Sequence, residues 1–136
     1  MFKALSPVQS RKRSAPSRRL RILVADDNRD AVATLQALLQ SEGHHVRAVQ
    51  RSADVLGVES EFKPDVVILD LQMPDISGYD LARWLRSRHP RGCPLLIAVT
   101  GAYTQPSDRS LSLHSGFDHH LTKPYRLAEL LALIPA

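Results

Sequence analysis

The sequence predicts an α/β fold: a doubly wound (βα)5 sandwich with a five-stranded parallel sheet. Two observations predict it. Five short apolar segments alternate with segments of helical periodicity, and short polar loops join them. The apolar segments are apolar at consecutive positions, which is typical of parallel strands covered by helices on both faces.

The expected strands are runs rich in Val, Ile, Leu and Ala, each five to seven residues long. They are residues 20–25, 44–49, 64–70, 94–100 and 117–121. The last of these, FDHHL, is the shortest and the least apolar.

The expected helices have apolar residues three or four positions apart, or carry a capping residue or a terminal glycine. They are residues 31–43, 52–62, 77–90, 105–116 and 125–134. In the first, Val32, Leu35 and Leu39 share one face and Gly43 ends the pattern. Ser52 is a plausible N-cap for the second, and Leu81, Trp84 and Leu85 form the apolar face of the third. The fourth has few apolar residues, and its expected start and end rest on Pro106 and Gly116.

Length and charge indicate one domain with a basic extension. The chain has 136 residues, of which 43% are hydrophobic and 24% are charged, as in a globular protein. Residues 1–21 contain seven basic residues and no acid, whereas the remainder has eleven basic and fourteen acidic residues, a net charge of −3. We therefore expect residues 1–19 to be a basic, disordered tail and residues 20–136 to be the folded domain.

The composition of the tail does not identify its binding partner. A basic arm can contact nucleic acid or an anionic surface, or remain a solvated extension. We expect at most weak nucleic-acid binding through it, and no membrane association, because the chain has no apolar run long enough to span a bilayer. A single cysteine, Cys93, suits a reducing compartment, so a cytoplasmic location is expected.

Four of the five predicted strands lead to a polar residue at one edge of the sheet. In open α/β sheets, functional groups gather beyond the carboxyl ends of the strands. The residues expected there are Asp26, Asp27, Asp70, Thr100 and Lys123. Three close carboxylates repel one another and favour a hard cation, so the set predicts a Mg²⁺ (or Mn²⁺) site. An Asp70 oxygen could then attack a phosphoryl donor, with Lys123 and Thr100 contacting the phosphoryl oxygens.

Four motifs in order, VADDN (24–28), LDLQMPDISG (69–78), VTG (99–101) and LTKP (121–124), resemble the receiver domain of two-component response regulators. The resemblance spans residues 20–134 and implies a flavodoxin-like fold, in which the strand order of the sheet is 2-1-3-4-5. It implies that Asp70 is the phospho-acceptor, that Asp26 and Asp27 are the acidic pair, and that the backbone carbonyl of Gln72 completes the metal site. It also implies that Thr100 is the switch hydroxyl and Lys123 the phosphate-pairing amine.

The resemblance extends to partners and to residues around the site. It implies a sensor histidine kinase or histidine phosphotransfer protein as phosphodonor, an unknown protein target, and a possible homodimer. It implies a cis peptide at Pro124, and it places Ala102, with Gln72, where the lifetime of the acyl phosphate is tuned. His120 stands where the family often has an aromatic switch residue; it could fill that role or be a surface variant.

The chain ends at Ala136, directly after the last expected helix. We therefore expect a stand-alone receiver. We expect no enzymatic activity except catalysis of its own phosphorylation and dephosphorylation. The signal is expected to pass through the surface formed by the fourth helix, the fifth strand and the fifth helix. Two alternatives stay open: a receiver-like scaffold that works without phosphate, and the C-terminal receiver of a hybrid histidine kinase.

Overall fold

The computed structural model describes residues 19–101 and 116–135. They form a five-stranded parallel sheet with the order β3-β2-β4-β5-β6, which is 2-1-3-4-5 in chain order. The predicted fold class is confirmed. The strands are β2 (Arg21–Ala25), β3 (His45–Val49), β4 (Val66–Asp70), β5 (Leu95–Thr100) and β6 (His119–Thr122). The described helices are α1 (Arg29–Ser41), α2 (Ser52–Phe62), α3 (Gly78–Arg88) and α5 (Leu127–Leu133).

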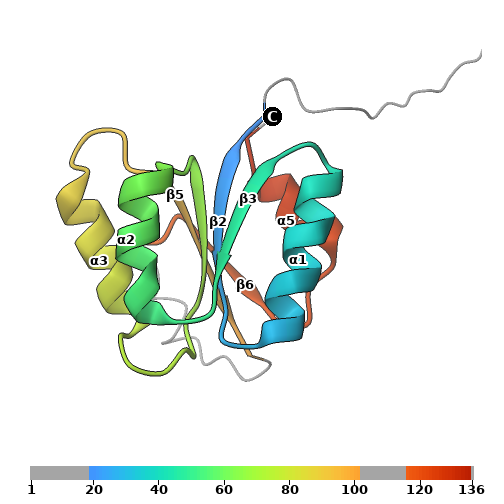
Figure 1. The fold of residues 1–136 in the computed structure, drawn as a ribbon, viewed down its shortest axis with the longest axis horizontal. Helices are drawn as coiled ribbons and strands as arrows, with labels where there is room; N and C mark the ends of the chain where they lie inside the picture. Colours follow the sequence, from blue (N-terminus) through green and yellow to red (C-terminus); the bar gives the residue numbers. More distant parts are fainter. Residues whose placement is uncertain (1–18, 102–115, 136) are drawn as a thin grey trace, which may run out of the picture.

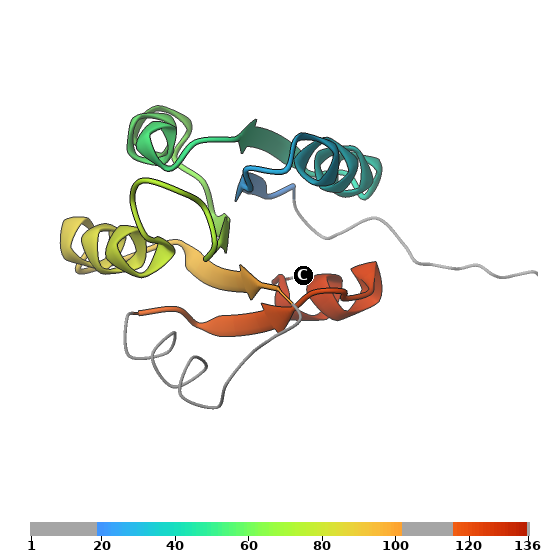
Figure 2. The same cartoon turned by 90° about the horizontal axis from the view of Figure 1, so that it is seen from below.

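The sheet lies between two helical layers, with α1 and α5 on one face and α2 and α3 on the other (Figures 1 and 2). Two apolar clusters fill the space between the layers. Val55, Leu81 and Leu85 belong to the cluster under α2 and α3, whereas Leu39 and Leu130 belong to the cluster under α1 and α5. Because β4 is buried at all five of its positions, both faces of the central strand contribute to the core.

Predicted boundaries agree with the observed ones within two residues, and the differences have local causes. Helix α1 begins at Arg29, earlier than predicted, because the Asn28 side chain accepts a hydrogen bond from the Ala31 amide at 3.0 Å and caps the helix there. Helix α5 begins at Leu127, later than predicted, where the Glu129 side chain accepts from the backbone N–H of Arg126 at 2.9 Å. Tyr125 therefore lies in a loop.

Two sequence predictions fall on the rest of the chain. The helix expected at 105–116 and nearly all of the basic tail lie outside the described residues.

Among the residues that the structure does describe, no helix is long and apolar enough to cross a membrane.

A buried histidine ties the start of β2 to the α1–β3 connection. His44 is 8% exposed, and its Nδ1 accepts a hydrogen bond from the backbone N–H of Leu20 at 3.2 Å. Burial lowers the pKa of His44, and the nearby Glu42 carboxylate opposes that shift only partly. Since Nδ1 must be unprotonated to accept, protonation of the ring breaks this contact.

We predict that His44 makes the fold less stable in mild acid. The pKa of His44 in the folded state lies below its value in the unfolded chain. The stabilisation from His44 is therefore complete above the unfolded-state pKa, and it is lost as pH falls through that value and then through the folded-state pKa. Between pH 7.5 and 5, the wild type should lose about 0.5–1.5 kcal/mol more unfolding free energy than His44→Asn, whose amide oxygen can replace Nδ1 as acceptor. Urea unfolding followed by circular dichroism measures this, with exposed His45→Asn as the control. Equal losses in the wild type and His44→Asn would contradict the assignment.

Candidate functional site

The carboxyl ends of four neighbouring strands bring polar residues to one edge of the sheet, here called the rim. Asp26 and Asp27 follow β2, Asp70 ends β4, Thr100 ends β5 and Lys123 follows β6. Because the strands are parallel and in register, residues almost a hundred positions apart in sequence become neighbours. The rim is the edge that the sequence predicted.

Three carboxylates form a close cluster at the rim. One oxygen from each of Asp26, Asp27 and Asp70 lies within 4.8 Å of the others. Asp26 and Asp70 are buried, at 9% and 5% exposure, whereas Asp27 is exposed. The cluster therefore combines two shielded acids with one that faces solvent.

Lys123 provides the opposite charge. Its Nζ lies 2.9 Å from Asp26 Oδ2 and 3.3 Å from Asp70 Oδ2, so one ammonium contacts both buried acids. The sequence predicted Lys123 at the rim but did not predict its contact with Asp26. A buried carboxylate needs such a partner, because an unpaired charge of this kind costs several kcal/mol.

Backbone amides fix the orientation of the two buried acids. Asp26 Oδ1 accepts from the Asn28 amide, and Asp70 Oδ1 accepts from the Gln72 amide, each at 2.9 Å. Both contacts span two residues and close small turns of the kind that aspartate favours at strand ends. As a result, the Oδ2 atoms of both acids face Lys123.

The site shifts the pKa values of its members. Burial raises the pKa of Asp70, and the neighbouring Asp26 adds to the rise, while the Gln72 amide and Lys123 oppose it. Burial acts to lower the pKa of Lys123, but its hydrogen bonds and charge interactions with Asp26 and Asp70 outweigh this and raise it. The ammonium is therefore firmly protonated near neutral pH.

The other residues singled out in the sequence have different positions. Thr100 is buried, at 7% exposure, on the strand next to Asp70. Gln72 is exposed, with its amide on Asp70, and Ala102 lies outside the described residues. His120 is half-buried on β6 with both ring nitrogens shielded from solvent, so it is not a freely exposed surface residue. The Lys123–Pro124 peptide bond is cis.

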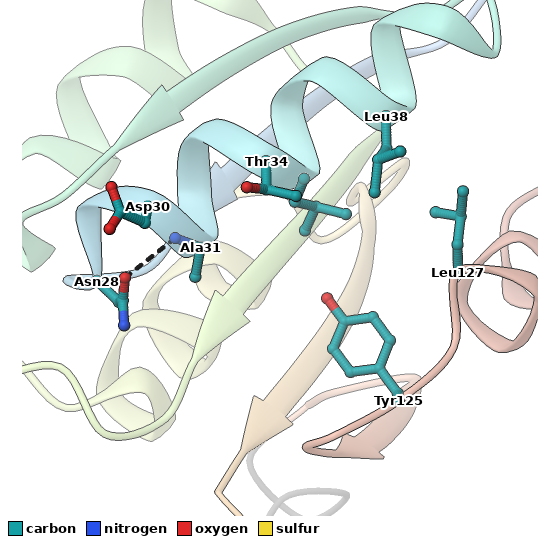
Figure 3. Close-up of a pocket in the computed structure, with 8 residues that line it drawn as sticks. Asn28, Asp30, Ala31, Thr34, Leu38, Tyr125 and Leu127 are labelled. Carbon is teal, nitrogen blue, oxygen red and sulfur yellow. Dashed lines mark hydrogen bonds between the residues drawn. The ribbon is translucent and has the colours of Figure 1, made fainter.

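A groove beside the rim was not predicted. Two adjoining pockets of about 440 and 450 Å³ lie between α1 and the loop before α5, and share Ala31, Leu35 and Tyr125. Figure 3 shows the first of them, with Tyr125 facing α1. One includes Asp26 and Lys123, and the other extends to Leu38, which is 39% exposed. Burial raises the pKa of Tyr125, Lys123 opposes the shift, and Asp26 and Asp70 add to it. This groove was not predictable from the sequence, because the periodicity of residues 125–134 places Tyr125 in a helix.

The donor set at the rim fits a hard divalent cation. Mg²⁺ prefers carboxylate oxygens and retains several waters, so a cluster with two shielded acids and one solvent-facing acid matches its needs. The neighbouring ammonium limits the excess negative charge without removing it, because one cation faces three carboxylates. Asp26, Asp27 and Asp70 are the residues that could hold such an ion.

The comparisons with known proteins agree with this geometry. The family model described as the response regulator receiver domain matches residues 22–135. The transcriptional regulatory protein GltR of Pseudomonas aeruginosa is 37% identical over 115 residues, which cover 85% of this chain and 47% of GltR. The chain thus spans about half the length of the curated relatives that it matches.

Two solved structures show the same likeness. A response regulator receiver domain protein from Clostridium thermocellum superposes with a TM-score of 0.77 at 28% identity, covering 84% of this chain and 90% of that one. The BeF3-activated DrrB receiver domain gives a TM-score of 0.74 at 28% identity, covering 85% of this chain and 93% of that one. With the family model matching nearly the whole described domain, the chain belongs to the response regulator receiver domain family.

Proposed function

We propose that this protein accepts a phosphoryl group on Asp70 from a phosphohistidine and signals through the resulting change at the rim. The observation that carries the proposal is the buried Asp70 carboxylate, held by the Gln72 amide on one oxygen and facing Lys123 with the other. A carboxylate held in this way is oriented to attack a phosphoryl donor, and the Lys123 ammonium lies where it can pair with the phosphoryl group on Asp70.

The proposed reaction is an in-line displacement. Asp70 Oδ2 forms the new O–P bond, the N–P bond of the phosphohistidine breaks, and the leaving imidazole nitrogen keeps the bonding electrons and takes up a proton. Lys123 Nζ, which contacts Asp70 Oδ2 at 3.3 Å, would move to an oxygen of the incoming phosphoryl group. Such transfer depends mainly on positioning and on neutralising charge, and the rim supplies both.

Mg²⁺ (or Mn²⁺) is the proposed cofactor. Asp26, Asp27, Asp70 and the backbone carbonyl of Gln72 would hold it. When bound, the ion would offset the negative charge shared between the carboxylates and the phosphoryl oxygens. Asp26 would keep its orientation through the Asn28 amide, which contacts the oxygen that does not face Lys123.

Thr100 and His120 are the proposed route from the phosphoryl group to the surface. Thr100 would turn its hydroxyl toward a phosphoryl oxygen and leave space on β5, where Ala98 is the register partner of His120. His120 would then change its packing, in place of the aromatic residue common in the family. Gln72 and Ala102 are proposed to set how long the acyl phosphate survives.

The groove beside the rim supports a protein as phosphodonor. Leu38 and Tyr125 line one part of it (Figure 3), and the adjoining part includes Asp26 and Lys123. We propose that a histidine kinase or histidine phosphotransfer protein lays a helix there, so that its phosphohistidine reaches Asp70. The target of the signal is proposed to be a further protein. The receiver domain is proposed to comprise residues 20–136.

We predict that Mg²⁺ affinity depends on the three rim acids. Asp27→Asn removes one carboxylate and should weaken Mg²⁺ binding at least about tenfold, the scale on which metal sites respond to the loss of supporting groups. Isothermal titration calorimetry measures this on the full chain. Glu61→Gln is the matched control, because Glu61 is exposed at the far end of α2. Equal affinity in the wild type and Asp27→Asn would place the ion elsewhere.

We also predict a single acid-labile phosphoryl adduct after incubation with acetyl phosphate and Mg²⁺, measured by intact-mass spectrometry. The adduct should be absent with chelator, because the proposed transfer needs Mg²⁺ to offset charge, and absent in Asp70→Asn, because the amide cannot form the O–P bond. Asp75→Asn is the matched control: Asp75 is an exposed acid five residues away, and its left-handed backbone, with φ of 74°, suits asparagine. Persistence of the adduct in Asp70→Asn would refute the assignment. Absence of any adduct, with no binding of beryllofluoride, would instead favour a scaffold that works without phosphate.

A further inference from the structure

The amino edge of the sheet, opposite the rim, carries exposed cations from three segments. Arg19 and Arg21 stand at the start of β2, Lys63 lies in the loop before β4, and Arg88 and Arg91 lie at the end of α3 and in the loop before β5. Parallel strands share this edge at their amino ends, so these loops lie together, on the far side of the sheet from Asp70 (Figure 1).

A pocket of about 430 Å³ opens at this edge. Lys63, Arg88, His89 and the hydroxyl-bearing Ser60 are among its lining residues. The acid in its lining, Glu59, is only 2% exposed and is bound by His89 at 2.8 Å, so it does not offset the outer cations. In the part of the chain that the structure describes, neither Lys63 nor Arg88 forms an ion pair.

Two of the other acids near this edge are paired with cations, Asp118 with Arg86 and Glu61 with Arg47. Asp65, which accepts from the neutral backbone amide of Arg21, and Glu42, at the end of α1, keep their charge, but the exposed cations of this edge outnumber them. The charge that this edge presents to solvent is therefore dominated by cations, whereas the rim is dominated by carboxylates. The two ends of the strands therefore carry opposite charge, positive at the amino edge and negative at the rim.

An aromatic ring lies next to the pocket. The Arg88 guanidinium stacks over the Trp84 ring at 4.5 Å, and Trp84 is 38% exposed. An exposed indole with a guanidinium over its ring offers aromatic surface on which a nucleobase can stack, and the guanidinium N–H groups can donate to phosphate. Such a surface combines base contact with charge.

The start of β2 adds positive charge at the same place. The Arg21 amide donates to Asp65 Oδ2 at 2.9 Å, and the Asp65 amide donates to the Arg21 carbonyl at 2.7 Å, so β2 begins beside the loop that contains Lys63. The Arg21 side chain donates from Nε to the Phe62 carbonyl at 2.9 Å, which holds its charge next to Lys63.

We propose that the amino edge is a binding surface for single-stranded nucleic acid. Phosphates would lie on Lys63, Arg88 and Arg91, and a base would stack on the Trp84–Arg88 pair. A nucleic acid fits better than an anionic membrane because the large exposed hydrophobic residues of the described chain are Leu38 and Trp84. Leu38 lies in the other groove, and Trp84 is a single, partly exposed ring with a guanidinium over one face, so this edge has no apolar wedge for a bilayer. The surface does not depend on phosphorylation of Asp70.

Fluorescence anisotropy with a labelled oligothymidylate tests the proposal on the full chain, over a series of salt concentrations. The double variant Lys63→Gln/Arg88→Gln should weaken binding at least about tenfold and reduce the salt slope by about 1.4, since each lost contact to single-stranded phosphate removes about 0.7. Trp84→Ala should weaken binding about fivefold with little change in slope, because stacking is not ionic. The matched control is Arg51→Gln/Arg126→Gln, two exposed cations toward the rim.

Several results would overturn the proposal. If the pocket variant binds like the control variant, the basic tail alone carries the affinity. If the oligonucleotide does not bind at low salt, or if vesicles of phosphatidylserine and phosphatidylcholine bind and the oligonucleotide does not, the edge is not a nucleic-acid surface. Circular dichroism of each variant confirms that loss of binding does not reflect loss of fold.

Discussion

The contact of Lys123 with two buried carboxylates is the interaction on which the site depends. Asp26 and Asp70 are almost completely shielded from water, and without Lys123 their proximity would be strongly unfavourable. Lys123 makes both anions tolerable, yet a single ammonium leaves the three-acid cluster with excess negative charge. The site is therefore stable as it stands and still able to accept a cation.

The fold explains how so polar a set can exist at the end of a nonpolar core. Four apolar strands run parallel, and each reaches the same edge just as its sequence turns polar. The carboxylates then lie where the sheet meets solvent, with backbone amides from the following loops to orient them. The opposite edge receives the helix ends and the loops before the strands, and these carry the exposed arginines and lysine.

Much of this could be predicted from sequence, because the signals are local. Consecutive apolar residues in 66–69 identify a buried strand, and the carboxylate that ends it identifies the rim. The pairing of Lys123 with Asp26 was not predictable, since it depends on the spatial order of strands that lie far apart in sequence. The α1–α5 groove was missed because it depends on Tyr125 lying in a loop, and that loop results from the cap at Arg126. The Trp84–Arg88 stack had a signal, an i, i+4 pair on one helix, but its place beside a basic pocket required the fold.

A crystal structure of the protein with Mg²⁺ and beryllofluoride would test the central claim most directly. The account predicts beryllium bonded to Asp70 Oδ2, the metal ion among Asp26, Asp27 and Asp70, and Lys123 Nζ moved from its carboxylate partners to a fluorine. A structure in which beryllofluoride is bound elsewhere, or in which Lys123 still bridges Asp26 and Asp70 beside a modified Asp70, would contradict the account.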